Sequence, residues 1–336
     1  MKFKDYPIHP SILQAIEDLG YKRPTDIQFK VIPHILNGED VMAVAPTGTG
    51  KTAAFAIPLI HKVNGYARKS GVQVLVMVPT RELARQIEQV FLDLSKHLSI
   101  SILSLIGGVE QESQIKKLKE NTQILITTPG RMFDLIAQGY LDISTVKMWV
   151  LDEADLMLDL GFARDIVDAK RKLPRYLQTL FFTATINKKI KSLAYDVVKD
   201  AIRIQITPGN PVSKNVDHQV MMVEMDDKRF FLENILIEYP EERFMIFVRT
   251  KVRAERVQKA MERIGISVEI LHGGKEQSER FNTLERFRSG VNKVLVTTDV
   301  ACRGIDIPEV EYVINYDLPD NPENYVHRCG RTGRGN

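Results

Sequence analysis

The stretch that decides the expected fold is Val41-Met42-Ala43-Val44-Ala45-Pro46-Thr47-Gly48-Thr49-Gly50-Lys51-Thr52-Ala53-Ala54-Phe55. Its apolar, valine-rich start predicts a strand, its small residues predict a turn, and its alanine-rich end predicts a helix. Backbone N–H groups of such a loop converge on phosphate oxygens at the positive end of the helix. A lysine at the helix start reaches the outer phosphates, and the threonine after it offers a hydroxyl to magnesium. The stretch therefore predicts a nucleoside triphosphate site formed by Ala45, Pro46, Thr47, Gly48, Thr49, Gly50, Lys51 and Thr52.

This loop departs from the usual phosphate-binding pattern at one place. Loops of the form G-x-x-x-x-G-K-[ST] begin with glycine, and here that place is occupied by Ala45. A glycine- and threonine-rich turn before an ordinary helix is the alternative interpretation. Because Lys51 and Thr52 follow a strand and open a helix, the context favours the phosphate loop.

Length and composition restrict the class of protein. A chain of 336 residues exceeds the usual size of one hydrophobic core, so we expect two domains of roughly 150 residues each. With 44% hydrophobic and 26% charged residues, the chain is expected to be globular. No apolar run approaches the roughly 20 residues of a membrane span, and no signal-peptide core follows the first residues. These features predict a cytoplasmic protein without membrane contact.

Charge and cysteine content exclude two simple interpretations. The net charge of +3 is too small to indicate a polyanionic partner, so any nucleic-acid contact depends on particular Arg, Lys, N–H and hydroxyl groups. Cys302 and Cys329 lie far apart in sequence and lack companion Cys or His residues at metal-binding spacing. The cysteines therefore predict neither a zinc site nor a disulfide framework, and packing in or near the core explains them.

Apolar runs alternate with helical patterns along the first part of the chain. After the first strand, such runs cover residues 72–78, 99–106, 123–128, 148–151, 179–182 and 201–206. Continuous apolar runs predict strands of a parallel sheet buried on both faces. Their alternation with helices predicts a doubly wound α/β domain, which we expect to span residues 1–207.

A second α/β domain is expected after a short linker. Residues 208–216 contain two prolines, a glycine and little apolar content, which is typical of a linker. Further strand-like runs cover residues 218–225, 244–248, 266–271, 294–298 and 312–316. The second domain is expected to span residues 217–336, and it has no Gly-Lys-Thr loop of its own.

Acidic side chains follow the strand predicted at residues 148–151. In open α/β sheets ligands bind at the carboxyl ends of the strands, and Asp152-Glu153-Ala154-Asp155 begins at such an end. One carboxylate there can hold magnesium through water, and its neighbour can orient the attacking water for phosphoryl transfer. We therefore assign Asp152, with Thr52, to magnesium and Glu153 to the base. An acidic N-cap and first helical turn is the alternative, and it suits Asp155.

With these residues in this order, the chain resembles the DEAD-box RNA helicases of helicase superfamily 2, which are named after Asp-Glu-Ala-Asp. The resemblance extends from Phe3 to Arg334 and rests on a series of motifs in the family's order. It implies two RecA-like domains joined by a short linker, and an ATP-dependent RNA helicase that acts as a monomer. ATP and Mg²⁺ are the implied cofactors. RNA is the implied partner, alone or in ribosomal and ribonucleoprotein complexes.

The resemblance also implies an adenine-recognition motif near the N-terminus. Pro24-Thr25-Asp26-Ile27-Gln28 matches this motif, and Phe3 stands seventeen positions before Gly20 as the family pattern requires. The Gln28 amide can donate to adenine N7 and accept from the N6 amine, a pairing that guanine does not satisfy. ATP rather than GTP is therefore the implied nucleotide, with Phe3 and Gln28 as binding residues.

Other motifs resemble the family's RNA-binding positions. Arginines, hydroxyls and glycines at helix N-termini suit sugar-phosphate contacts and do not read bases. Helix caps and turns are the alternative explanation for each motif taken singly. The RNA-backbone contacts implied by the resemblance are Arg81, Gly108, Thr128, Pro129, Gly130, Arg131, Arg249 and Thr298.

The remaining motifs are implied to connect the two domains and to complete the ATP site. Coupling between the nucleotide and RNA sites is assigned to Asp155, Thr183, Thr185 and His327, with Thr183 where the family usually has serine. Asp306 is assigned to the ribose of ATP, and Arg331 and Arg334 to arginine fingers on the γ-phosphate. The family's second domain normally continues with a final strand and helix, so the resemblance implies that the chain is truncated at Asn336.

The function implied is closure of two domains on ATP and RNA, local unwinding of a short duplex, and hydrolysis that resets the enzyme. An ATP-dependent RNA clamp or scaffold with little unwinding is one alternative. A DNA helicase or translocase of the same superfamily is another, which 2′-hydroxyl recognition would distinguish. A small GTPase is disfavoured because the chain contains no Asn-Lys-x-Asp sequence.

Overall fold

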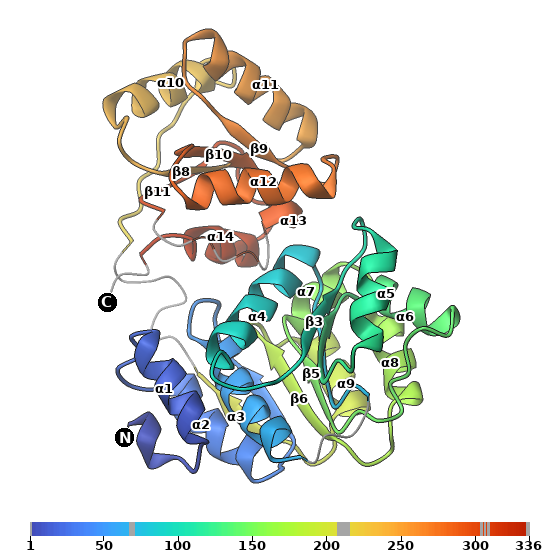
Figure 1. Cartoon of the computed structure of the whole chain (residues 1–336). Helices are drawn as coiled ribbons and strands as arrows, with labels where there is room; N and C mark the ends of the chain where they lie inside the picture. Colours follow the sequence, from blue (N-terminus) through green and yellow to red (C-terminus); the bar gives the residue numbers. More distant parts are fainter. Residues whose placement is uncertain are drawn as a thin grey trace. The chain divides into compact units, whose positions relative to one another are not determined.

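The computed structural model describes residues 2–66, 71–206, 216–302, 305, 307 and 310–333. The chain divides into two compact units, residues 1–207 and 208–336, and each unit is described here by itself (Figure 1). The linker predicted at residues 208–216 lies, except for Val216, outside the described residues. Among the described residues, no helix has both the length and the apolar character needed to span a membrane.

The first unit contains one parallel sheet of seven strands in the order β3-β4-β2-β5-β6-β1-β7. These strands are β1 (Val41–Val44), β2 (Val74–Met77), β3 (Ile102–Leu105), β4 (Ile124–Thr127), β5 (Met148–Leu151), β6 (Gln178–Thr183) and β7 (Ile202–Gln205). β2, β4, β5 and β6 are buried along their whole length, as continuous apolar runs predict. Each strand falls within or beside its predicted range.

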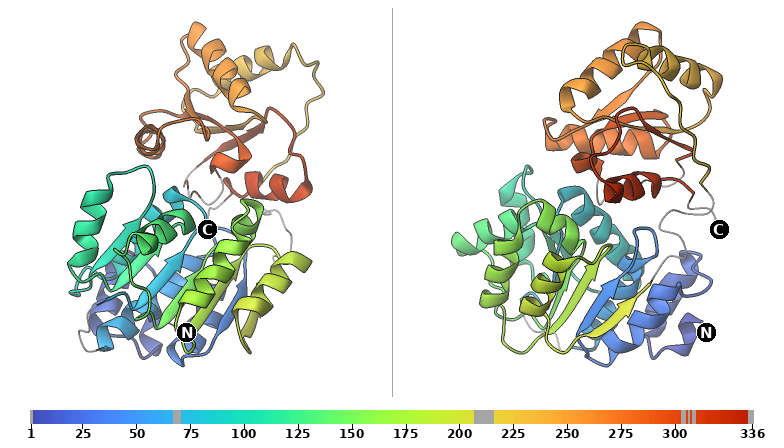
Figure 2. Two further views of the ribbon diagram at one scale, coloured as in Figure 1. Left: turned by 90° about the vertical axis from the view of Figure 1, so that its right-hand side faces the viewer. Right: turned by 180° about the vertical axis from the view of Figure 1, so that it is seen from behind.

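Helices cover both faces of this sheet (Figures 1 and 2). The helical elements are η1 (Phe3–Asp5), α1 (Pro10–Asp18), α2 (Asp26–Leu36), α3 (Lys51–Gly65), α4 (Arg81–Leu94), α5 (Gln111–Lys119), α6 (Pro129–Ala137), α7 (Ala154–Asp159), α8 (Ala163–Lys172) and α9 (Lys188–Val197). Neighbouring residues of β6 face opposite layers. Phe181 packs in the core formed with α6 to α9, while Phe182 contacts Phe55 of α3 at 5.1 Å between ring centroids.

The second unit contains a smaller parallel sheet in the order β11-β8-β10-β9. Its strands are β8 (Phe244–Phe247), β9 (Glu269–Leu271), β10 (Val294–Thr297) and β11 (Tyr312–Asn315), and its helices are α10 (Lys228–Glu238), α11 (Lys251–Arg263), α12 (Gln277–Arg288), α13 (Asp299–Cys302) and α14 (Pro322–Cys329). Two hydrophobic clusters lie on the two faces of the sheet. The predicted α/β class is thus confirmed in both units.

One predicted strand is wrong. Residues 218–225 were expected to be a strand because they contain a run of valine and methionine, but the structure forms none there. The side chains of Val220 and Met222 are 88% and 91% exposed. A strand requires a hydrogen-bonded neighbour, and no strand in the described part of the chain pairs with this segment. Apolar content alone therefore did not determine its conformation.

Candidate functional site

The sheet of the first unit brings the predicted nucleotide-binding segments to one edge. Because all its strands are parallel, the segments that follow β1, β5 and β6 leave the sheet at the same, carboxyl end. These three strands are direct neighbours in the sheet. The loop at residues 45–50, the acids after β5 and the threonines after β6 therefore lie side by side.

The loop after β1 has the backbone shape that phosphate binding requires. Gly48 and Gly50 have φ angles of +81° and +90°, which side chains other than glycine rarely adopt. Thr49 Oγ1 donates to the carbonyl oxygen of Pro46 at 2.8 Å and closes the turn. Lys51 Nζ donates to the Ala45 carbonyl oxygen at 3.0 Å, so the buried ammonium lies under the loop. The free N–H groups at the start of α3 complete a cradle for anionic oxygens.

The adenine-recognition motif packs directly against this loop. Gln28 Nε2 donates to the Gly50 carbonyl oxygen at 3.1 Å, and Gln28 Oε1 accepts from the Thr25 N–H at 3.0 Å. Thr25 Oγ1 donates to the Thr49 carbonyl oxygen at 2.8 Å. Sequence reasoning had missed this role of Thr25, although its place as N-cap of α2, three residues before Gln28, is a capping-box signal. Phe3 is buried beside Tyr21, and the adenine contacts of Phe3 and Gln28 stay predictions.

Gly50→Ala is expected to weaken nucleotide binding because the loop has no room for a methyl group. A Cβ atom at Gly50 would lie 2.5 Å from Gln28 Nε2, and the φ of +90° strains any L side chain by roughly 1–2 kcal/mol. Titration with a fluorescent ATP analogue measures the effect. Gly65→Ala is the matched control, since Gly65 ends the same helix with no atom within 4 Å of a new Cβ. Equal affinity of both variants would contradict the proposed loop geometry.

Two carboxylates follow β5 in distinct environments. Asp152 is buried, and burial raises the pKa of its carboxyl group, while the charge of Lys51 opposes this rise. Asp152 Oδ1 accepts from the Glu153 N–H at 2.9 Å. Glu153 has a φ of +51°, an uncommon value for a residue with a side chain, and it stands at the N-cap position of α7 without a capping hydrogen bond from its side chain. Backbone strain of this kind is typical of functional sites.

These residues fit a nucleotide-bound magnesium ion. Mg²⁺ prefers oxygen ligands and usually keeps several waters when it binds through one carboxylate and substrate phosphates. Asp152 supplies a desolvated carboxylate next to the phosphate loop, and Thr52 supplies a half-buried hydroxyl in the first turn of α3. The roles of Asp152 and Thr52 as metal residues stay predictions.

Asp155 connects the acidic segment to the loop after β6. Asp155 Oδ2 accepts from both the N–H and the hydroxyl of Thr185, each at 3.0 Å. Thr183, fully buried at the end of β6, donates its hydroxyl to the Thr185 carbonyl oxygen at 2.9 Å. Asp155 is thus more than part of a helix cap. The three predicted coupling residues of this unit form one hydrogen-bonded group.

The predicted RNA-binding residues of the first unit follow the other strands of the same edge. Strands β3, β4 and β2 are neighbours, and they lead to Gly108, Thr128 and Arg81. Arg81 starts α4 behind the N-cap Thr80, and its guanidinium lies against Gly107. Thr128, Pro129, Gly130 and Arg131 form the cap and first turn of α6. Arg81, Gly108 and Thr128 thus lie along one half of the edge, next to the nucleotide half.

Arg131 makes contacts within the protein that the sequence did not predict. Its guanidinium donates to Gln111 Oε1 at 2.8 Å and to the Val109 carbonyl oxygen at 3.2 Å. Only 9% of this side chain is exposed. Arg131 therefore holds the loop that contains Gly108 against α6. Contact of Arg131 with RNA stays a prediction.

In the second unit, Arg249 and Thr298 also follow neighbouring strands. Arg249 comes after β8 and Thr298 after β10, at the carboxyl edge of the smaller sheet. Arg249 is largely exposed, and its Nε lies 3.4 Å from Asp320 Oδ1. The Arg249 N–H donates to Asp317 Oδ2 at 3.0 Å. Both residues lie at this edge, and their contact with RNA stays a prediction.

A residue that sequence reasoning missed, Arg328, fixes this edge. The 2% exposed Arg328 donates from Nε and Nη2 to the two carboxylate oxygens of Asp299, at 2.6 and 2.7 Å. Its Nη1 donates to Asn315 Oδ1 and the Asp317 carbonyl oxygen. The four-residue spacing of Asn324 and Arg328 places both on one face of α14 and was the available signal. This network joins α14 to the start of α13 and to the end of β11.

Arg328→Ala is expected to destabilise the second unit by at least about 2 kcal/mol. The change removes a bidentate charged pair and leaves buried acceptors without donors. Thermal unfolding followed by circular dichroism measures the loss. Arg286→Ala is the control, because this arginine pairs with Glu269 while 56% exposed and is expected to contribute about 1 kcal/mol or less. Equal melting temperatures for both variants would contradict the structural role of Arg328.

The predicted arginine fingers are only partly described. Arg331 is 2% exposed, and its Nη1 donates to the Ile305 carbonyl oxygen. His327 lies in the last turn of α14 and is half-buried. Arg334 and Asp306 lie outside the described residues. The structure therefore holds Arg331 inside its own unit, and its action on ATP stays a prediction.

Comparisons with known proteins cover nearly the whole chain. Residues 25–193 match the family model of the DEAD/DEAH box helicases, and residues 227–336 match that of the helicase conserved C-terminal domain. The DEAD-box ATP-dependent RNA helicase CshA of Bacillus cereus is 39% identical over 332 residues, which is 99% of this chain and 63% of CshA. RNA helicase CrhR of Synechocystis is 39% identical over 331 residues, which is 98% of this chain and 67% of CrhR.

A similar solved structure is Saccharomyces cerevisiae Dbp5 bound to RNA and ADP BeF3. Its TM-score to this chain is 0.88 at 31% identity, over 99% of this chain and 86% of Dbp5. The two parallel-sheet units thus have the fold of RecA-like helicase domains. The chain spans about three fifths of the length of the CshA relative, and this similarity concerns the part that the two proteins share.

Proposed function

Because the chain belongs to the DEAD/DEAH box helicase family, we propose that it is an RNA-dependent ATPase that locally unwinds or remodels RNA. We assign the two helicase domains to residues 1–207 and 217–336. The observation that best supports the proposal is that one sheet edge has two halves, one suited to ATP and the other to an RNA backbone. The segments suited to ATP follow β5, β6 and β1, and those suited to an RNA backbone follow β3, β4 and β2.

ATP binding by the first unit follows from the contacts around the loop. The N–H groups at residues 48–52 hold the phosphates, Lys51 neutralises their outer charge, and Gln28 reads adenine. Mg²⁺, when bound by Thr52 and through water by Asp152, supplies positive charge to the phosphate oxygens. Glu153 orients the attacking water and takes its proton. The αL backbone of Glu153 supports a functional role, because such a conformation is uncommon for a residue with a side chain.

Coupling between ATP and RNA is assigned to the group formed by Asp155, Thr183 and Thr185. Asp155 stands two residues after the base Glu153, and its carboxylate is bound by the loop after β6. A shift of that loop on ligand binding would therefore move the acidic segment. The added methyl group of Thr183, compared with serine, points to tighter packing at the end of β6, where this side chain is fully buried.

The second unit is assigned to complete the ATP site and to grip RNA. ATP and RNA together draw the two units closed, Asp306 contacts the ribose, and Arg331 and Arg334 contact the γ-phosphate. Arg331 must leave the Ile305 carbonyl oxygen to do so. Arg249 and Thr298 contact the RNA backbone on their own sheet edge. Closure bends one strand of a duplex, and release of phosphate reopens the enzyme.

An ATPase assay with and without single-stranded RNA tests the proposal. We expect RNA to stimulate phosphate release, and Lys51→Ala to abolish both basal and stimulated rates through loss of ATP binding. Deoxy substrates of the same sequence are expected to stimulate weakly, because RNA recognition uses the 2′-hydroxyl. A hydrolysis rate that RNA does not raise, or equal stimulation by DNA, would contradict RNA as the substrate.

A parallel strand-separation assay distinguishes the helicase from an RNA clamp. Release of one strand from a short duplex in the presence of ATP supports unwinding. ATP-dependent retention of RNA with stimulated hydrolysis but no strand release supports the clamp. The same protein preparation serves both assays, so an inactive sample is recognised by its missing ATPase rate.

A further inference from the structure

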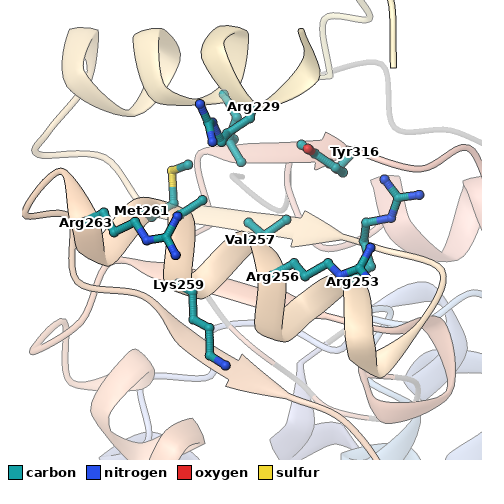
Figure 3. A pocket seen from close by; sticks show the side chains of 10 residues that line it. Arg229, Arg253, Arg256, Val257, Lys259, Met261, Arg263 and Tyr316 are labelled. Carbon is teal, nitrogen blue, oxygen red and sulfur yellow. The ribbon is translucent and has the colours of Figure 1, made fainter. Parts of the chain in front are cut away.

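A cationic hollow lies between α10 and α11 of the second unit. At one end it adjoins the sheet edge that carries Arg249, because its lining residue Arg253 lies 3.6 Å from Asp317, which accepts the Arg249 N–H. The volume of the hollow is about 320 Å³. Figure 3 shows Arg263 at one end and Arg253, Arg256 and Tyr316 at the other, with Arg229 reaching in from α10. The cationic side chains that line it are Arg229, Arg253, Arg256, Lys259 and Arg263.

The positive charges of this hollow are only partly neutralised by the protein. Arg229 pairs with Glu233 at 3.2 Å, and Arg253 lies 3.6 Å from Asp317. Arg256, Lys259 and Arg263 are exposed, and within the described part of the chain no carboxylate lies within ion-pair distance of them. No acidic side chain lines the hollow.

Helix geometry brings three of these cations together, although Glu255 and Glu262 stand four and three residues from Lys259 and offset part of its charge. Arg256 and Lys259 are three residues apart, and Lys259 and Arg263 are four apart, so they stand on one face of α11. Like charges at these spacings repel each other. A bound anion would remove the repulsion, and arginine forks bind carboxylates through two parallel hydrogen bonds.

The base of the hollow is apolar, which discriminates between two kinds of anion. Leu232, Val257 and Met261 form it, and all three are buried in the core beneath. A sugar-phosphate backbone offers anionic oxygens but no aliphatic side chain to cover this apolar base. Tyr316 is the one aromatic residue among the lining residues, and Lys228 Nζ lies 5.5 Å from its ring centroid. The hollow therefore suits carboxylates beside an aliphatic side chain better than it suits an RNA backbone.

We propose that this hollow is a docking site for a short acidic segment of a partner protein, with one aliphatic anchor residue. From Arg253 to Arg263 the helix rises about 15 Å, the length of about five residues of extended peptide. In such a peptide every second side chain lies on the same face, so carboxylates two positions before and two positions after an anchor can meet the arginines at the two ends. The aliphatic anchor lies over the stems of the arginines and the apolar base.

Fluorescence anisotropy with the full chain tests this proposal. The probe is a labelled peptide of about seven residues, Asp and Glu with one central Leu. Control peptides carry Asn and Gln in place of the acids, or Ser in place of Leu. We expect the acidic peptide to bind, with loss of affinity in both controls and at high salt. No binding of the acidic peptide to the wild-type chain would overturn the proposal.

The double variant Arg256→Glu/Arg263→Glu is expected to lower the affinity for the acidic peptide by roughly tenfold or more, because it replaces two attractive charge pairs with repulsive ones. A peptide with Lys and Arg in place of the acids should bind this variant better than it binds the wild type. The matched control is Lys116→Glu/Lys117→Glu, two exposed lysines of α5 in the first unit, which should leave peptide binding unchanged.

The affinity for a labelled single-stranded RNA of about ten nucleotides is measured for the same proteins, to test whether the hollow binds RNA instead. If Arg256→Glu/Arg263→Glu lowers RNA affinity while acidic-peptide binding stays at the wild-type level, the hollow extends the RNA path and the proposal is wrong. Equal peptide binding by all three proteins would also refute it. Melting temperatures show whether a variant loses peptide affinity because it unfolds. Binding of the Lys/Arg peptide to Arg256→Glu/Arg263→Glu gives independent evidence that this variant is folded.

Discussion

Glu153→Gln is expected to slow ATP hydrolysis by about 10²- to 10⁴-fold while ATP and RNA still bind. The amide has nearly the same shape as the carboxylate, but it cannot accept the proton of the attacking water. Glu153 follows Asp152 directly at the nucleotide edge of the sheet, and its N–H donates to the Asp152 carboxylate. The variant should therefore accumulate with both ligands bound.

Single-turnover hydrolysis of labelled ATP, with binding measured separately, gives the size of this effect. Glu17→Gln is the matched control, because Glu17 is exposed on α1 and is expected to leave the rate unchanged. A wild-type rate in Glu153→Gln would mean that another group activates the water. A parallel loss of ATP affinity would instead mean that Glu153 shapes the loop.

Arg331→Ala is expected to slow hydrolysis by about 10³-fold, the lower end of what an arginine finger contributes. The guanidinium stabilises negative charge that develops on the γ-phosphate, so its effect is on the rate of the chemical step. In the structure Arg331 is buried and bound to the Ile305 carbonyl oxygen. The two roles predict different results for the same variant.

A purely structural Arg331 would lower the melting temperature and RNA affinity of the variant together with its rate. A finger would lower the rate while RNA binding without nucleotide stays near the wild-type value. Arg328→Ala is the comparison variant, because we expect it mainly to lower the melting temperature of the second unit. If Arg331→Ala behaves like Arg328→Ala in every assay, the finger assignment is wrong.

The fold was largely predictable because its strands are short apolar runs buried on both faces. β2, β4 and β5 lie in parallel pairing at the centre of the sheet, where apolar content alone marks a strand. The segment 218–225 has similar composition but lies exposed, because a strand also depends on a neighbour that composition does not reveal. Pairing partners are a property of the whole domain.

The site was predictable to the level of residue types and their common sheet edge. Sequence spacing placed Asp155 beside the nucleotide acids but did not show its hydrogen bonds to Thr185. Arg131 and Arg328 illustrate the limit more sharply. The sequence predicted an RNA contact for Arg131 and no role for Arg328, yet both side chains are largely buried and hydrogen-bonded within the protein. Long side chains reach partners that linear spacing does not specify.

The central claim is that ATP and RNA together close the two units around one ATP site. Energy transfer between dyes on Tyr195→Cys in the first unit and Val291→Cys in the second measures this, since both positions are highly exposed. Cys302 and Cys329 are buried, so they should label poorly. The account predicts a change in transfer efficiency when ATP and RNA are added together to the Glu153→Gln variant, and little change with either alone. Unchanged efficiency with both ligands bound would contradict it.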